Sequence, residues 1–270
     1  GSTSNVRGAS VPGTPTVILG CTPRFCWGLT TNPLDVTDAY SETFVVNTYG
    51  LPTHTVYQGR IEPVQTIFQS YVVNRLDGVP DNAARDTSIG YLNGGVTVIV
   101  PRRNNGPVVS ITGNTGLSVQ YAGWGPTFEL EAFRQVSRAQ NLDQFRTALT
   151  NFDVGSQNFV YAGLDGNIAY FTTAEMPIRD DLQNLNNVDG NPPFLIRDGS
   201  GTKRNEWLPV TNRKPNQNVP YEILGPNEMP FVINPASGYI ANANDDPVGA
   251  TSDNNPLNQV RPGGGLYYLN

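Results

Sequence analysis

The residues of this sequence best suited to chemistry form two clusters of acids and amides. The first lies within residues 30–40, where Asp35 and Asp38 flank Thr37. Two carboxylates and a backbone carbonyl within one turn of chain are the hard oxygen ligands that calcium takes. A solvated loop whose aspartates form turns explains the same spacing equally well. This cluster predicts either a calcium site or an acidic turn.

The second cluster ends the segment Gly238–Pro247, which reads GYIANANDDP. Its first four residues are strand-like, and the polar residues that crowd together after them are Asn242, Asn244, Asp245 and Asp246, with Asp253 a few positions further on. An Asx-rich turn that closes a strand is the ordinary explanation of such a segment.

Other chemical motifs are weak. His54 is the single histidine and lies in a Pro-containing loop, so a Ser/His/Asp triad has no further support. The run RPGGG near the C-terminus lacks the Lys and Ser/Thr of a phosphate-binding loop, and G-x-S-x-G is absent. Cys21 and Cys26 could face each other across a hairpin, but two small buried hydrophobic residues are the favoured interpretation.

Composition excludes several classes of protein. The 270 residues carry a net charge of −6, and no basic run suggests nucleic acid as a partner. No apolar stretch is long enough to cross a membrane, so we do not expect one as a partner. The 28 glycines and 22 prolines follow no period, which favours strands joined by irregular loops. Both ends of the sequence read as cuts, and we expect a fragment or a processed subunit.

The elements that must position these clusters are mostly strands. Strand-like runs are TVILG, RFCWGL, ETFVVN, the β-branched run around residues 67–73, and Val96–Val100 and Gly106–Ile111 across a PRRNN turn. Helical spacing is confined to Phe128–Asn151, with a break at residues 140–141. Asn158–Ala162 and Ile168–Phe171 flank an Asp-Gly turn, and residues 180–230 read as loops. The pattern predicts a β-rich α+β fold without a compelling domain boundary.

Three motifs resemble the penicillin amidases, a family of N-terminal-nucleophile (Ntn) hydrolases. They are GASVPGTPTVILG with RFCWGLTTNPLDVTDAY, then QNFVYAGLDGNIAYFTTAEMPIR, then MPFVINPASGYIANANDDP. They occur in the family's order and together span nearly the whole chain. The resemblance implies an αββα sandwich, with residues 1–270 forming part of the large (β) subunit. It also implies autoproteolytic processing of a precursor, a small α subunit as partner, and a periplasmic or secreted protein.

The resemblance also implies a nucleophile. In the family it is a serine that opens the large subunit, and its own α-amino group acts as the base, so no histidine is required. Ser4-Asn5 superficially copies that Ser-Asn start, but a loop leading into the strand at Val6-Arg7 is the favoured interpretation. We therefore expect the nucleophile to be missing from this chain, and the isolated chain to be inactive.

The family's oxyanion hole maps onto two positions. The register along WGLTT assigns the backbone N–H to Thr31, and the register along GYIANAN assigns the side-chain amide to Asn244. Asn242 and Asp245 would then hold Asn244 in place. The substrate would be a penicillin-like, acyl-homoserine-lactone or related N-acyl amide. Leu19 and Leu29 match positions that line the family's acyl pocket, with ordinary core packing as the alternative.

The calcium loop of the family matches the first cluster. The carboxylates of Asp35 and Asp38, the carbonyl of Thr37 and, less closely spaced, the carboxylate of Asp253 would bind a structural calcium, with a further ligand from the small subunit. No organic cofactor is implied.

A second class of protein also suits the composition. An extracellular β-rich, calcium-dependent module that binds carbohydrate or protein could use the aromatic residues Trp27, Trp124, Trp207, Tyr267 and Tyr268 as a stacking face. These aromatic residues share no spacing, which favours the amidase.

Overall fold

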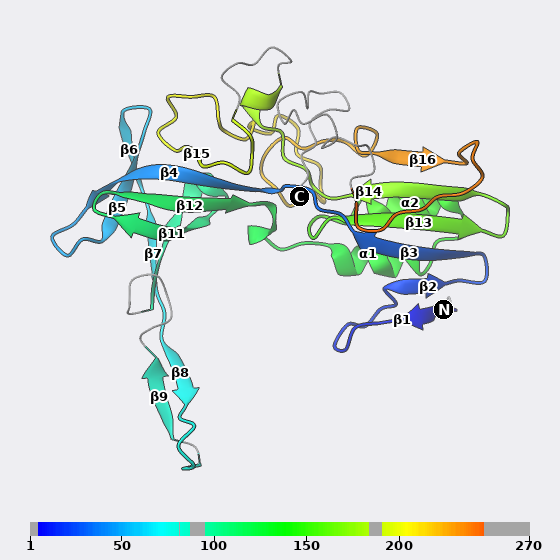
Figure 1. Cartoon of the computed structure of the whole chain (residues 1–270), viewed down its shortest axis with the longest axis horizontal. Helices are drawn as coiled ribbons and strands as arrows, with labels where there is room; N and C mark the ends of the chain where they lie inside the picture. Colours follow the sequence, from blue (N-terminus) through cyan, green and yellow to red (C-terminus); the bar gives the residue numbers. More distant parts are fainter. Residues whose placement is uncertain (1–4, 81, 87–94, 184–190, 246–270) are drawn as a thin grey trace. The chain divides into compact units, whose positions relative to one another are not determined.

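The computed structural model describes residues 5–80, 82–86, 95–183 and 191–245 (Figure 1). The chain divides into two compact units. Unit 1 comprises Gly1–Val36, Gly125–Pro192 and Glu206–Asn270, and unit 2 comprises Thr37–Trp124 and Pro193–Asn205. We had expected one family domain over the whole chain, and here we describe each unit by itself.

Unit 1 contains an antiparallel sheet of six strands in the order β1-β2-β3-β13-β14-β16. The strands are β1 (Arg7–Ala9), β2 (Leu19–Cys21), β3 (Phe25–Thr31), β13 (Gln157–Gly163), β14 (Ile168–Thr173) and β16 (Phe231–Ile233). The hairpin predicted around the Asp-Gly turn is confirmed as β13 and β14, which pair from Gln157↔Thr173 to Ala162↔Ile168.

Two helices pack on one face of this sheet. They are α1 (Glu129–Val136) and α2 (Leu142–Leu149), so the helical region predicted for residues 128–151, with its break, is confirmed. The break falls where the Asn141 side chain accepts the N–H of Gln144 at 2.9 Å and so caps α2. Alternate residues of the strands, such as Phe25, Trp27 and Phe159, join the apolar sides of the helices in one core. The opposite face of the sheet therefore carries the other residues of each strand.

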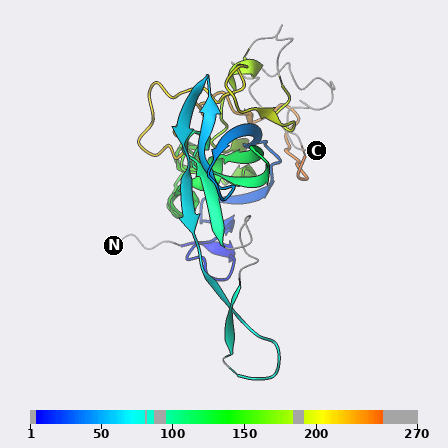
Figure 2. The ribbon, with the colours of Figure 1, turned by 90° about the vertical axis from the view of Figure 1, so that its left-hand side faces the viewer.

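Unit 2 contains a second sheet of eight strands, ordered β6-β5-β4-β12-β11-β10-β7 with β15 beside β4. Its strands are β4 (Thr37–Val46), β5 (Pro52–Tyr57), β6 (Arg60–Pro63), β7 (Gln65–Phe68), β10 (Val96–Val100), β11 (Gly106–Thr112), β12 (Thr115–Tyr121) and β15 (Arg197–Asp198). The core contains Phe44, Val98, Val100 and Val108. Figure 2 shows β8 (Tyr71–Asn74) and β9 (Ala83–Asp86) as a two-stranded ribbon of their own.

The single strand predicted around residues 67–73 is wrong. The chain forms β7 and then β8 because it changes partner at Gln69, with β7 pairing to β10 and β8 to β9. Three short 3-10 helices complete the elements: η1 (Pro101–Arg103), η2 (Ala122–Trp124) and η3 (Asp180–Leu182). Between residues 191 and 230 the described chain is irregular except for β15, as the sequence predicted.

The two cysteines are joined. Cys21 and Cys26 face each other between β2 and β3 and form a disulfide bond. The favoured interpretation as buried thiols is therefore wrong, because Cys21 is only half-buried and Cys26 is exposed. No helix among the described residues is both long enough and apolar enough to cross a membrane.

Candidate active site

The two predicted oxyanion donors lie next to each other in unit 1. Thr31 is the last residue of β3, and its backbone N–H donates to Oδ1 of Asn244 at 2.8 Å, across 213 positions of sequence. Both residues are exposed. In this arrangement the Thr31 N–H is bonded to the asparagine itself, so a substrate oxygen would have to replace Oδ1.

Asn244 sits in a turn that is fixed by its neighbours. Its N–H donates to Oδ1 of Asn242 at 3.1 Å, and the N–H of Ala243 donates to Oδ1 of Asp245 at 3.1 Å. The backbone of Asn244 is left-handed, with φ of 63°, a conformation that asparagine tolerates better than most residues. Asn242 and Asp245 thus bond the backbone around Asn244.

The turn does not follow a strand as the sequence suggested. Residues 238–241 form no strand, since β16 ends at Ile233 and Asn234 then turns the chain with φ of 49°. The turn instead lies against the end of β3, where Thr30 Oγ1 is 2.5 Å from Oδ1 of Asn242. A tertiary contact, rather than sheet pairing, holds it.

Beneath the turn lies a group of hydrogen-bonded residues that we call the amide network: Thr30, Asn158, Tyr170, Thr172 and Asn242. Asn158 is 1% exposed and its Nδ2 lies 3.0 Å from Oδ1 of Asn242. The hydroxyl of Tyr170 lies 2.6 Å from both Oδ1 of Asn158 and Oγ1 of Thr172. Sequence reasoning missed Asn158, Tyr170 and Thr172. The available signal was an asparagine at the start of the strand predicted for Asn158–Ala162.

One further amide beside the site is buried without a partner. Asn32 follows Thr31 and is 3% exposed, yet neither Nδ2 nor Oδ1 has a hydrogen-bond partner within the described part of the chain. Its backbone is fixed, since its N–H donates to the carbonyl of Ser156 at 3.1 Å. Burial of an amide without hydrogen bonds is costly.

The two leucines predicted to line an acyl pocket lie on strands β2 and β3 of unit 1. Leu29 packs against the helix-side core of unit 1, and Leu19 is 39% exposed on β2. Their role in an acyl pocket stays a prediction. His54 lies on β5 of unit 2, with Nδ1 3.0 Å from the Thr53 hydroxyl.

The two carboxylates predicted as calcium ligands each face an arginine. In unit 1, Asp35 is 1% exposed and lies 3.7 Å from Arg179, which also donates to its backbone carbonyl at 2.9 Å. In unit 2, Asp38 is fully buried and lies 3.8 Å from Arg197. Within the described ranges no three His, Cys, Asp or Glu side chains form a group suited to a metal. Calcium binding by Asp35, Thr37, Asp38 and Asp253 stays a prediction.

Of the remaining residues predicted for a site, most lie outside the described part of the chain. Thr37 opens β4, whereas Ser4, Asp246, Asp253, Tyr267 and Tyr268 lie outside the described residues.

Trp27 and Trp207 are 4% and 2% exposed, and Trp124 is 45% exposed. Because two of the three tryptophans are buried, the aromatic face expected of a carbohydrate-binding module is not formed by them.

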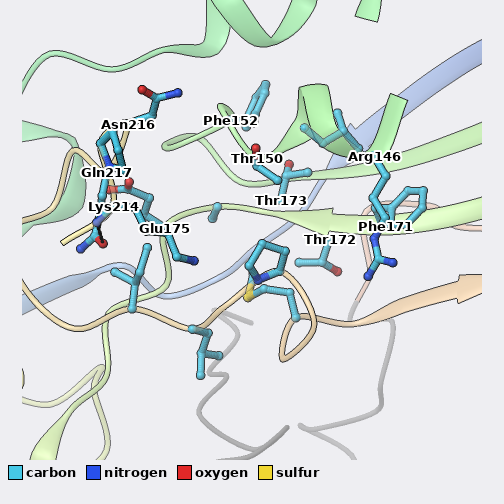
Figure 3. Close-up of a pocket in the computed structure, with 17 residues that line it drawn as sticks. Arg146, Thr150, Phe152, Phe171, Thr172, Thr173, Glu175, Lys214, Asn216 and Gln217 are labelled. Atoms are coloured by element: carbon cyan, nitrogen blue, oxygen red, sulfur yellow. Dashed lines mark hydrogen bonds between the residues drawn. The ribbon is translucent and has the colours of Figure 1, made fainter. Parts of the chain in front are cut away.

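Unit 1 also contains a cavity of about 320 Å³. Figure 3 shows Glu175 on the same side of it as Lys214, Asn216 and Gln217, with Arg146 and Phe171 on the other. Glu175 is 5% exposed, and its carboxylate accepts the N–H groups of Asn218 and Val219 at 2.7 and 2.6 Å. Burial nevertheless raises the pKa of Glu175 to about 7. None of the predicted site residues lines this cavity.

Comparison with known proteins identifies the class. A sequence model of the penicillin amidase family matches residues 1–262. The chain therefore belongs to the penicillin amidase family. Among solved structures it is similar to the thermostable penicillin G acylase from Alcaligenes faecalis, with a TM-score of 0.64, 21% identity and 90% of this chain covered. That likeness shows a shared β-rich fold. The match covers 37% of the acylase chain, so this chain spans little more than a third of its length.

Proposed function

We propose that this chain is part of an amidohydrolase that cleaves the acyl amide of a penicillin-like, acyl-homoserine-lactone or related N-acyl substrate. The family match supports the reaction class. The observation that carries the proposal is the contact of Thr31 N–H with the Asn244 side chain at 2.8 Å, because it brings together two donors 213 positions apart.

The proposed reaction is acyl transfer through an amino-terminal serine that does not lie among the described residues. Its hydroxyl attacks the substrate carbonyl while its own amine takes the proton, and the carbonyl oxygen becomes negatively charged. Thr31 N–H and Nδ2 of Asn244 donate to that oxygen. The amine of the substrate leaves with the proton, and water then releases the acid from the acyl-serine. Without that serine the isolated chain is expected to be inactive.

The Asn244 side chain must rotate before its Nδ2 and the Thr31 N–H can both donate to the oxyanion. Thr31 N–H now donates to Oδ1 of Asn244. If the side chain rotates, its Nδ2 and the Thr31 N–H can point at one oxygen, and the substrate oxygen replaces Oδ1 as the acceptor. The exposure of both residues leaves room for this exchange.

The same proposal covers the architecture and partners. The helices of unit 1 cover one face of its sheet, which is the arrangement of one half of an αββα sandwich. We propose that autoproteolysis yields this large subunit and a small α subunit. The Cys21–Cys26 disulfide supports a periplasmic or secreted protein, because disulfides persist in oxidising compartments.

A structural calcium remains part of the proposal. Asp35, Thr37, Asp38 and Asp253 would supply oxygens, with a further ligand from the α subunit. It takes no part in the chemical steps. Calorimetry with calcium on the complete enzyme and on its Asp38→Ala variant tests it. If calcium does not bind, or if binding is equal in the two proteins, the assignment is wrong.

Acyl specificity is proposed to involve Leu19 and Leu29. If Leu29 lines the pocket, its replacement by phenylalanine in the complete enzyme shifts preference towards shorter acyl chains. A panel of N-acyl amides of increasing length measures this, and an unchanged profile would remove Leu29 from the pocket.

The decisive experiment uses Asn244→Ala in the complete enzyme. Loss of one oxyanion donor lowers kcat by about 10²–10³-fold. Asn234→Ala is the matched control, because Asn234 is also an asparagine of unit 1 with positive φ but has not been placed in the site. Normal kcat in Asn244→Ala would refute the assignment, and absence of amide hydrolysis in the unmodified enzyme would refute the function.

A further inference from the structure

Asn158 occupies an unusual place for a polar residue. It is the second residue of β13, in register with Thr30 of β3 and Thr172 of β14, and it is 1% exposed. The next residue, Phe159, belongs to the helix-side core. Because successive side chains of a strand alternate, Asn158 lies on the sheet face opposite the helices. A buried amide at such a position is tolerated only if its atoms are hydrogen-bonded.

The hydrogen bonds fix which way the amide points. Tyr170 O–H donates to Oδ1 of Asn158 at 2.6 Å, while Nδ2 lies 3.0 Å from the Thr31 carbonyl and 3.2 Å from the Thr30 hydroxyl. Nδ2 is also 3.0 Å from Oδ1 of Asn242. A carbonyl can only accept, so the opposite orientation of Asn158 would set oxygen against oxygen. The Thr31 carbonyl therefore selects the orientation in which Asn158 donates to both segments of the site, and the Tyr170 hydroxyl, which can donate or accept, holds it by donating to Oδ1.

This single amide joins the two segments that carry the proposed oxyanion donors. One segment is the end of β3, whose Thr31 carbonyl accepts from Nδ2. The other is the turn, because Oδ1 of Asn242 accepts from Asn158 and also from the backbone N–H of Asn244. A displacement of either segment would misdirect a donor, and catalytic donors must be held within about 0.5 Å of their productive geometry.

We propose that Asn158, oriented by the Thr31 carbonyl and held by Tyr170, is a positioning residue that sets the Thr31 and Asn244 donors relative to each other. The proposal rests on the amidase function proposed above. Asn158 touches no reacting atom in it. Its contribution is to kcat, through the geometry of two groups that stabilise the oxyanion.

The test replaces Asn158 by aspartate in the complete enzyme. Asn158→Asp keeps the shape but turns Nδ2 into an oxygen that faces the backbone carbonyl of Thr31 and Oδ1 of Asn242. We expect kcat per active site, counted with a serine-reactive inhibitor, to fall about 100-fold, the loss expected when a reacting group is misplaced by about 1 Å. KM and the affinity for the product acid should be unchanged, while a tetrahedral transition-state analogue should bind more weakly by the same factor. Tyr170→Phe, which removes the hydroxyl that holds Oδ1 of Asn158 and adds no charge near the oxyanion, should lower kcat several-fold.

Asn151→Asp is the matched control. Asn151 is 3% exposed, its Nδ2 donates to the Ala148 carbonyl at 3.2 Å, and its Oδ1 accepts from Asn216 at 2.9 Å. This variant should lower the melting temperature without changing kcat per active site.

The outcomes separate the two proposals. If the unmodified enzyme hydrolyses amides and Asn244→Ala is slow, but folded Asn158→Asp turns over normally, only the positioning role is wrong. If Asn158→Asp does not fold, Tyr170→Phe decides, and an unchanged kcat there overturns the role. An equal loss of kcat in Asn151→Asp would reduce the effect to general stability. An unmodified enzyme without amidase activity overturns both proposals.

Discussion

Two buried polar clusters of unit 1 are built from different chemistry. The amide network beneath the Asn244 turn consists of asparagines and hydroxyls. The other, which we call the carboxyl cluster, consists of Glu129, Asp153 and Glu175, and each of its carboxylates accepts backbone N–H groups. Both clusters fix segments that are distant in sequence. They differ in charge.

The difference in charge determines how each cluster responds to pH and to a nearby negative charge. Burial raises the pKa of Glu175 to about 7 and that of Asp153 to about 6, so the carboxyl cluster changes charge within the neutral range. The amide network contains no carboxylate, and its asparagines do not titrate. A negative charge beside a developing oxyanion would oppose it, whereas neutral amides fix the donors without that penalty. Beneath the candidate site the molecule thus uses amides and hydroxyls, whereas the Asp245 carboxylate in the Asn244 turn is exposed.

The largest effect on the free energy of unfolding is expected for Glu175→Ala. This change leaves the buried N–H groups of Asn218 and Val219 without their acceptor, and each such loss costs about 1–3 kcal/mol. The free energy of unfolding, measured with urea at pH 5, should fall by about 2–6 kcal/mol. Asp165→Ala, in the exposed turn between β13 and β14, should change it little. Equal losses in the two variants would show that burial does not distinguish them.

The second effect is a pH dependence of stability that is expected for the carboxyl cluster and not for the amide network. The folded-state pKa of Glu175 is raised from 4.5 to about 7, so the folded protein holds a proton that the unfolded chain has released. Its contribution to stability is complete below pH 4.5 and is lost as pH rises through 7, by roughly 3 kcal/mol. Asp153 adds a loss between pH 3.8 and about 6, while Arg213 opposes the shift at Glu175. Urea unfolding across this range should show a slope that Glu175→Gln reduces, and an unchanged slope would contradict the assignment.

A smaller, pH-independent loss is expected in the amide network. Asn242→Ala removes the acceptor of the Asn244 N–H and of the Thr30 and Asn158 side chains. The free energy of unfolding should fall by about 1–3 kcal/mol. Because no charge is involved, the loss should be equal at pH 5 and pH 8. A loss that varies with pH would show that the network is coupled to a titrating group.

The smallest effect on the free energy of unfolding depends on whether a buried asparagine side chain is hydrogen-bonded. Asn32 is 3% exposed and Asn158 is 1% exposed, but only the side chain of Asn32 makes no hydrogen bond within the described residues. Asn32→Leu should therefore raise the free energy of unfolding by about 1 kcal/mol, whereas the same change at Asn158 should lower it. Thermal unfolding of the two variants compares them. A decrease for Asn32→Leu would indicate that its amide is used.

The sequence predicted the elements that depend on neighbouring residues and the site residues that belong to a family motif. The helical spacing in residues 128–151 and the Asp-Gly hairpin were readable because each depends on neighbours in the chain. The resemblance also named Thr31 and Asn244, which the fold brings together. The role of Asn158 was not readable, because its partners on β3, on β14 and in the Asn242 turn meet only in the folded sheet. The disulfide was missed because spacing alone does not distinguish bonded from free cysteines.

The left-handed backbone of Asn244 limits which amino acids its position can accept. Glycine suits a φ of 63° but has no amide to donate, and glutamine has the amide but a side chain that makes this conformation costly. Aspartate fits the backbone and brings a charge of the wrong sign. If Asn244 is the proposed oxyanion donor, its backbone and side chain together therefore select asparagine alone. In a library of all substitutions screened for turnover, this exposed position should be as intolerant as a packed core position.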